Sequence, residues 1–194
     1  MNEKIDPKQA ILLVMDYQNG IVNRIPNVEP IITHMTETLT QVRAAGLAVG
    51  YVRVAMTDEE FAAVPATNKS FSAAAATRAM HADAPETQVI DAVKPQPDDI
   101  VVRKRRVGAF STTDLHEQLQ ARGITTLILA GFSTSGVVLS TVRDAADKDY
   151  RLFVIEDLTA DGDPEVHDLL MQKVFPRQAQ VITADTLTGL LATA

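Results

Sequence analysis

The chain has 194 residues, a formal net charge of −7 and no cysteine. The lack of cysteine excludes disulfides, cysteine-ligated zinc, iron–sulfur clusters and a cysteine nucleophile. The acidic balance argues against nucleic acid or an anionic membrane as a partner, and no apolar run is long enough for a membrane helix. We therefore expect one cytoplasmic domain over residues 1–194, with no signal peptide.

The first half of the chain predicts buried strands and one clear helix. Residues 10–15 (AILLVM) are an uninterrupted apolar run, which is typical of a strand buried on both faces of a parallel sheet. Residues 30–45 carry apolar side chains at helical spacing, and residues 47–54 and 100–102 are two further apolar runs. The segment 57–99 is too long for an ordinary connection, so we expect it to form an interface or a lid.

The second half alternates helices with strands. In chain order the pattern predicts a helix at 113–122, a strand at 126–130, a helix at 135–148, a strand at 152–155, a helix at 164–174 and a strand at 181–183. Asp163 is expected to cap the helix that begins at Pro164, and Asp185 to cap a last helix. This alternation predicts an α/β fold, a three-layer α/β/α sandwich around a mostly parallel six-stranded sheet.

Residues at the carboxyl ends of the predicted strands are the candidates for chemistry, because ligands of open parallel sheets bind at that edge. Asp16 ends the first strand and is suited to general acid or base work, although an Asp there also caps turns. Lys104 lies in a basic run, residues 103–106, which has two interpretations. The run is either a solvated surface patch, or it directs Lys104 into the site, where the lysine holds Asp16 ionised or binds an anion.

The segment 131–136 (GFSTSG) links a predicted strand to a helix. Its small residues allow backbone amides and the following helix start to approach an anion. It contains neither a GxGxxG nor a Walker sequence, so a nucleotide is not indicated. Ser133, Ser135 and Ser140 are conceivable nucleophiles, but none lies in a GxSxG elbow. The four histidines are too scattered to indicate a metal site.

Three segments together resemble the isochorismatase-like (cysteine hydrolase) superfamily. They are 12–18 (LLVMDYQ), 104–110 (KRRVGAF) and 129–137 (LAGFSTSGV). Further likeness is found in TDL at 113–115, TVRDA at 141–145 and VIED at 154–157, in the same order as in the family. The resemblance implies a Rossmann-like α/β/α fold, a hydrolase with a small-molecule substrate, and a homo-oligomer, either a dimer or a tetramer.

The family's catalytic triad is Asp, Lys and Cys. Asp16 and Lys104 match the first two, whereas Val137 stands at the position of the cysteine, six residues after the glycine of the turn. The resemblance therefore implies that the nucleophile is missing and that a thioester route is closed. It also implies a cis peptide bond between Phe132 and Ser133.

Isochorismatases resemble this chain in keeping the Asp and the Lys without the cysteine, and they hydrolyse a vinyl ether to pyruvate and a dihydroxy acid. On this basis Asp16 is expected to act as general acid or base and Lys104 as its electrostatic partner. The residues expected to surround the substrate are Gln18, Phe110, Phe132, Ser133, Thr134, Ser135 and Gly136. The zinc ligands of nicotinamidases are not evident after the second strand, so we expect no metal and no cofactor.

Three functions remain open at this point. The first is a hydrolase of a small carboxylated or amide-type metabolite that works without a cysteine. The second is a catalytically silent ligand-binding or regulatory module, and the third is a structural scaffold. The pair Asp16 and Lys104 favours the first, and Val137 favours the other two because it removes the nucleophile and narrows the pocket.

Overall fold

The computed structural model describes residues 4–191, which contain one six-stranded parallel sheet in the order β3-β2-β1-β4-β5-β6. The strands are β1 (Ala10–Met15), β2 (Ala48–Val54), β3 (Ile100–Lys104), β4 (Thr126–Gly131), β5 (Arg151–Ile155) and β6 (Gln180–Ile182). The helices are α1 (Asn19–Val22), α2 (Val28–Ala44), α3 (Asp58–Ala62), α4 (Ser72–Thr77), α5 (Leu115–Ala121), α6 (Leu139–Ala146), α7 (Pro164–Leu169) and α8 (Ala184–Leu191). The predicted α/β fold is confirmed.

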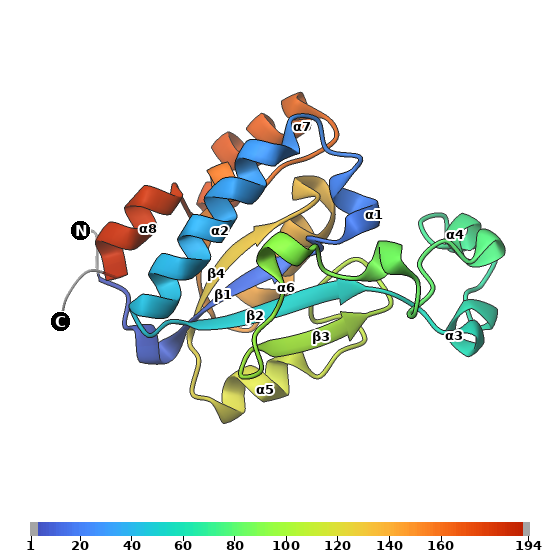
Figure 1. Ribbon diagram of the computed structural model, residues 1–194, viewed down its shortest axis with the longest axis horizontal. Coiled ribbons are helices and arrows are strands. Elements are labelled where there is room, and N and C mark those ends of the chain that lie inside the picture. Colours follow the sequence, from blue (N-terminus) through green and yellow to red (C-terminus); the bar gives the residue numbers. More distant parts are fainter. Residues whose placement is uncertain (1–3, 192–194) are drawn as a thin grey trace.

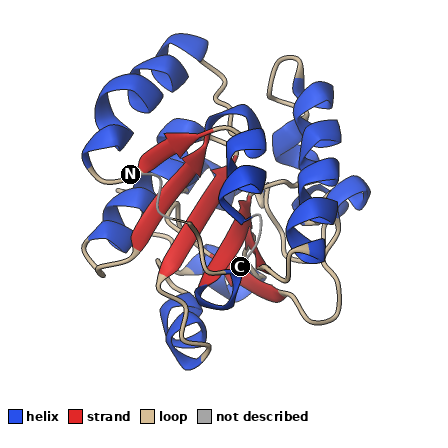
Figure 2. Ribbon diagram, turned by 90° about the vertical axis from the view of Figure 1, so that its left-hand side faces the viewer, coloured by secondary structure: helices blue, strands red, loops and turns tan. Residues whose placement is uncertain are grey.

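The sheet lies between two layers of helices (Figure 2). All six residues of β1 are buried, and alternate side chains enter the two apolar layers. Leu12 and Val14 pack in the layer that contains residues of α2 and α8, whereas Leu13 and Met15 pack with residues of α5 and α6. This double burial explains why the strand has no polar residue before Asp16.

The direction of the chain across the sheet reverses between β1 and β4. From β1 the chain proceeds outward through β2 to β3, then returns to β4 beside β1 and proceeds outward the other way (Figure 1). Open parallel sheets bind ligands in the crevice at such a reversal. No helix within residues 4–191 is long and apolar enough to cross a membrane.

The predicted helices 135–148 and 164–174 are each interrupted by a π-helical turn. The first turn, Thr134–Val138, precedes α6, and the second, Leu170–Val174, follows α7. In the first turn the N–H of Val138 donates to the carbonyl oxygen of Ser133, five residues earlier, at 3.3 Å. Apolar periodicity does not distinguish this wider turn from an α-helix, because both bury the same stripe of side chains.

The two predicted helix caps have different outcomes. The side chain of Asp163 accepts a hydrogen bond from the N–H of Glu165, so this cap is confirmed. The expectation for Asp185 is wrong, because this residue lies within the first turn of α8. Thr183 takes that place instead, and its hydroxyl accepts from the N–H of Thr186 at 3.2 Å. Both types of side chain cap helices well, so composition alone does not select between neighbouring positions.

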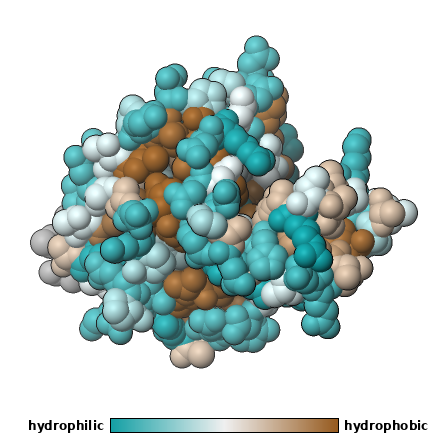
Figure 3. Space-filling model, turned by 45° about the vertical axis from the view of Figure 1, so that its right-hand side comes forward, coloured by the Kyte–Doolittle hydropathy of each residue, from teal (hydrophilic) through white to brown (hydrophobic). Residues whose placement is uncertain are grey.

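The segment 57–99 contains the short helices α3 and α4, which project from the ends of β2 and β3 as a lobe (Figure 1). Beneath the lobe, Phe61 and Phe71 pack with Val54 and Met56 in a small apolar cluster separate from the two main layers. The surface of the lobe combines hydrophilic and weakly hydrophobic residues (Figure 3). A role as an interface or a lid stays a prediction.

Candidate functional site

Asp16 and Lys104 meet although their strands are not neighbours. Asp16 follows β1, Lys104 ends β3, and β2 lies between these strands. The Lys104 Nζ donates to Asp16 Oδ2 at 2.8 Å, and the two residues are 1% and 5% exposed. The backbone of Asp16 is left-handed (φ 58°), while its N–H bonds to the carbonyl of Val52 at 2.8 Å. A non-glycine residue held in this conformation is frequent at functional sites.

The two oxygens of the Asp16 carboxylate have different surroundings. Oδ2 accepts from Lys104, whose Nζ also donates to the carbonyl oxygen of Val107 at 2.8 Å. Oδ1 is buried and has no hydrogen-bond partner within the described residues. Burial raises the pKa of Asp16 to about 6, and Lys104 opposes that rise. The carboxyl group therefore holds a proton more readily than an exposed aspartate, and one of its oxygens makes no hydrogen bond within the described residues.

The turn after β4 lies beside the end of β1. The Phe132–Ser133 peptide bond is cis, which confirms the bond implied by the resemblance. The Phe132 ring lies 4.3 Å from the ring of Tyr17, measured between centroids. A Cβ on Gly131 would be 2.8 Å from the carbonyl oxygen of Met15, so only glycine permits this approach of β4 to β1.

The amides of this turn are bonded within the protein. The N–H of Thr134 donates to the Ala160 carbonyl, and that of Gly136 to Ser133 Oγ. Both the N–H and the hydroxyl of Ser135 donate to Asp161 Oδ2 at 2.7 Å. These bonds occupy three of the amides that the sequence suggested for an anionic ligand.

Asp161 therefore binds the turn in the way that an external anion would. Burial raises the pKa of the Asp161 carboxyl, but hydrogen bonds from Ser135 and from the backbone of Asp163 and Gly162 outweigh burial and hold the pKa below its usual value. No sequence motif indicated Asp161. A carboxylate 26 residues beyond Ser135 is brought to it only by the return of the chain through β5.

Gln18 is engaged with the backbone through its whole amide group. Its Oε1 accepts from the Val54 N–H at 2.8 Å, and its Nε2 donates to the carbonyl oxygens of Val54 and Thr87. Gln18 therefore joins the end of β2 to the segment 57–99. Its expected contact with substrate stays a prediction.

The remaining candidates lie in apolar surroundings. The Phe110 ring stacks on Tyr150, with centroids 6.1 Å apart, in the layer that also contains Val137. Val137 is 2% exposed.

The hydroxyl of Thr134 lies 2.8 Å from His167 Nδ1 of α7, a contact that the sequence did not indicate. Within residues 4–191, no group of three or more acidic, histidine or cysteine side chains could hold a metal ion.

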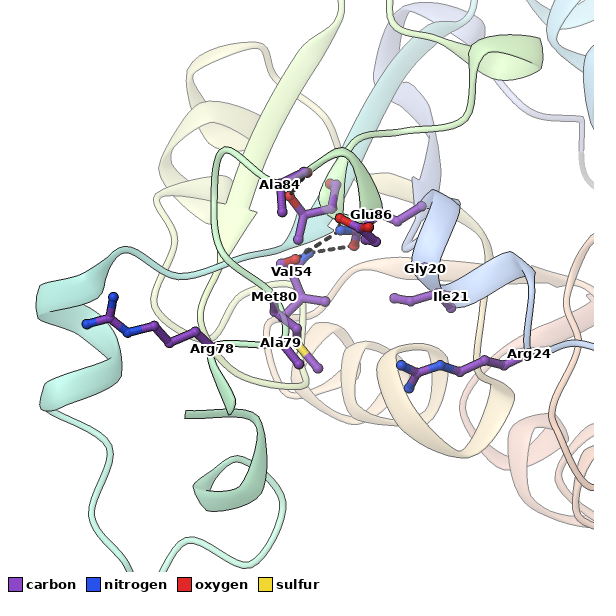
Figure 4. A pocket seen from close by; sticks show the side chains of 11 residues that line it. Gly20, Ile21, Arg24, Val54, Arg78, Ala79, Met80, Ala84 and Glu86 are labelled. Carbon is purple, nitrogen blue, oxygen red and sulfur yellow. Dashed lines mark hydrogen bonds between the residues drawn. The ribbon is translucent and has the colours of Figure 1, made fainter. Parts of the chain in front are cut away.

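A pocket of about 190 Å³ lies between α1 and residues 78–87, with Gln18 and Val54 among its lining residues (Figure 4). Its other lining residues are Gly20, Ile21, Arg24, Arg78, Ala79, Met80, Ala84, Glu86 and Thr87. The sequence did not predict this pocket, because its two walls come from segments more than 50 residues apart.

Residues 10–186 match the family model described as the isochorismatase domain. The chain belongs to the isochorismatase family. The isochorismatase family protein YecD of Escherichia coli O157:H7 is 28% identical over 191 residues, which cover 97% of this chain and 99% of that protein.

Two solved structures have the same fold. A cysteine hydrolase from Pseudomonas syringae pv. phaseolicola 1448A superimposes with a TM-score of 0.89 at 22% identity, covering 97% of this chain and 94% of that one. N-carbamoylsarcosine amidase from Thermoplasma acidophilum superimposes with a TM-score of 0.74 at 26% identity, covering 91% and 97%. This chain belongs to the same family but contains no cysteine, so it cannot use the nucleophile for which a cysteine hydrolase is named.

Proposed function

We propose that the chain is a hydrolase of the isochorismatase family that acts on a small carboxylated or amide-type molecule without a cysteine nucleophile. In this proposal Asp16 is the general acid or base, and Lys104 is its electrostatic partner. The observation that carries it is the buried Asp16–Lys104 pair, in which one carboxylate oxygen, Oδ1, has no hydrogen-bond partner among residues 4–191. Similarity to an N-carbamoylsarcosine amidase supports amides as one class of substrate.

For a vinyl ether, Asp16 acts as the acid. Burial raises the pKa of Asp16 to about 6, so its carboxyl holds a proton more readily near neutral pH than an exposed aspartate does. Oδ1 gives its proton to the methylene carbon of the enol ether, and water adds to the oxocarbenium carbon that results. The hemiketal then separates into a keto acid and an alcohol, and the proton lost by the water returns to Asp16.

For an amide, the ionised Asp16 acts as the base. It takes a proton from water as the water attacks the carbonyl carbon, and it then returns the proton to the leaving nitrogen. Lys104 donates two hydrogen bonds, to Asp16 and to the Val107 carbonyl. Its third N–H is the group proposed to bind the substrate's carboxylate or carbonyl oxygen.

A hydrolysis screen with vinyl ethers and small amides tests the proposal. Asp16→Asn keeps the shape of the side chain but removes the acid, so we expect turnover to fall about 100-fold or more. Activity that is unchanged in Asp16→Asn would contradict the mechanism. Val137→Cys is the complementary variant, and a gain of amidase turnover would support the view that only the nucleophile is missing from the family's site.

A catalytically silent ligand-binding module is the second candidate. The burial of the pair favours this candidate, because Asp16 and Lys104 are only 5% and 1% exposed and a substrate has little access to them. This candidate predicts saturable ligand binding without turnover of any substrate in the same screen. Turnover that depends on Asp16 would reject it.

The proposal includes one folded unit over residues 1–194 and a cytoplasmic homo-oligomer, a dimer or a tetramer, as the resemblance implies. Size-exclusion chromatography with light scattering measures the mass of the assembly. A monomer at micromolar concentration would contradict the proposed oligomer.

A further inference from the structure

The pocket between α1 and residues 78–87 is next to the proposed catalytic pair. Gln18, one of its lining residues, donates through its backbone N–H to the Asp16 carbonyl at 2.8 Å. Two other lining residues, Ile21 and Met80, belong to the same apolar cluster as Val107, whose carbonyl oxygen holds Lys104. Asp16 and Lys104 do not themselves line the pocket, but these contacts connect its wall to the residues that hold the pair.

The size and lining of the pocket define what it can hold. Its volume is about 190 Å³. An apolar cavity of about 150 Å³ is known to hold benzene, so this pocket suits one ring with a small substituent or a short chain of similar size. Ile21, Val54, Met80 and Ala84 give it largely apolar walls, which favour a ligand with an apolar body.

The charged residues at the rim are not equivalent. Arg78 pairs with Asp58 at 3.1 Å and points away from the pocket, whereas Arg24 extends back toward the other lining residues (Figure 4). Neither Arg24 nor Glu86 forms an ion pair with any residue between 4 and 191. Glu86 lies across the pocket, against Gly20. An uncompensated guanidinium at a pocket mouth is a binding group for a carboxylate.

We infer that this pocket binds a small monoanion, a carboxylate with an apolar body of about one ring, and that Arg24 selects its charge. The inference names the class of substrate for the proposed hydrolase. It rests on the proposed function only where it calls the ligand a substrate. Binding itself requires no turnover, so it is measured separately.

Benzoate is the probe, and benzamide is its neutral counterpart of the same shape. Each is titrated into the 15N-labelled full chain, and shifts of backbone amide signals give both the affinity and the location. We expect benzoate to shift α1 and residues 78–87 and to bind more tightly than benzamide. Arg24→Gln should weaken benzoate binding about tenfold and leave benzamide unchanged, as expected for loss of one charge-assisted hydrogen bond.

Three further variants sharpen the test. Glu86→Gln removes the rim's negative charge and should strengthen benzoate binding, opposite in sign to Arg24→Gln. Ala84→Leu fills the pocket and should abolish binding of both probes. Arg122→Gln changes an exposed arginine at the end of α5 and should have no effect.

The inference is overturned if benzoate shifts a different region, or if Arg24→Gln and Arg122→Gln weaken it equally. It is also overturned if benzamide binds as tightly as benzoate. Benzoate binding in this pocket without turnover in any hydrolysis assay would reject only the proposed catalytic function. Hydrolysis of carboxylated substrates that is unaffected by Arg24→Gln would reject only this inference.

Discussion

Asp16 and Asp161 lie beyond the carboxyl ends of two strands of the same sheet, but their carboxylates are held in opposite ways. Asp161 accepts hydrogen bonds from the amide and hydroxyl of Ser135, and these lower its pKa. Asp16 is more deeply buried, has one partner, Lys104, and has one oxygen without a partner within residues 4–191, so its pKa is raised to about 6. The same residue type therefore binds the turn after β4, whereas after β1 it is the group that we propose as the general acid or base.

The difference shows that position at the strand ends does not by itself make a carboxylate reactive. Asp161 has its hydrogen-bonding capacity satisfied, so exchanging a proton there would break several bonds. At Asp16 a proton can be gained on Oδ1 while Oδ2 keeps its bond to Lys104. Unsatisfied buried polar atoms are rare in folded proteins, which makes Oδ1 the most distinctive atom of the site.

The largest effect is expected from Lys104→Met, which leaves the Asp16 carboxylate buried without its cation. We expect the variant to lose about 3–5 kcal/mol of unfolding free energy at pH 8. The loss should shrink at pH 5, because the pKa of Asp16 rises further without Lys104 and the protonated carboxyl tolerates burial. Denaturant unfolding at the two pH values measures this, and an equal loss at both would contradict it.

Gln18→Leu tests the other polar side chain at the end of β1. It removes the partners of one N–H and two carbonyl groups, at Val54 and Thr87, and should lower stability by about 2–4 kcal/mol. Hydrogen exchange should quicken most in residues 78–87. Exchange that remains at wild-type rates there, with only ligand binding reduced, would assign Gln18 to substrate contact instead.

Asp161→Ala tests the satisfied carboxylate and should cost about 1–3 kcal/mol, because the amide of Ser135 loses its acceptor. The pKa of Asp161 is lowered in the folded state. Its stabilisation is therefore present above its usual pKa and is lost as pH falls below it. The difference in thermal midpoint between wild type and variant should thus be larger at pH 7 than at pH 3, and the reverse order would contradict the comparison.

His167→Ala has the smallest expected effect, about 1 kcal/mol, since the buried Thr134 hydroxyl loses one partner. Thr134→Val in the same background removes the unsatisfied hydroxyl and should recover part of the loss. A double-mutant cycle from chemical unfolding measures the coupling between the two side chains. A coupling near zero would show that this contact does not stabilise the turn after β4.

Particular residues show how far the sequence predicts this molecule. The apolar run 10–15 became β1, and the resemblance located both Asp16 and Lys104, as well as the cis bond at Phe132–Ser133. The hydrogen bond from the Ser135 amide to Asp161 was not predictable, because a local pattern contains no information about a partner 26 residues away. The pocket at Arg24 was missed for the same reason.

The sequence by itself determined the α/β class, the order of strands and helices, and the absence of a cysteine nucleophile. These follow from local periodicity and composition, which each stretch of chain carries without reference to the rest. Only the tertiary structure decided which of two carboxylates keeps an oxygen without a hydrogen bond within residues 4–191, which amides of the turn are occupied, and which charged side chains lie at the pocket. Those properties depend on burial and on partners brought together by the sheet, so they exist only once the chain has folded.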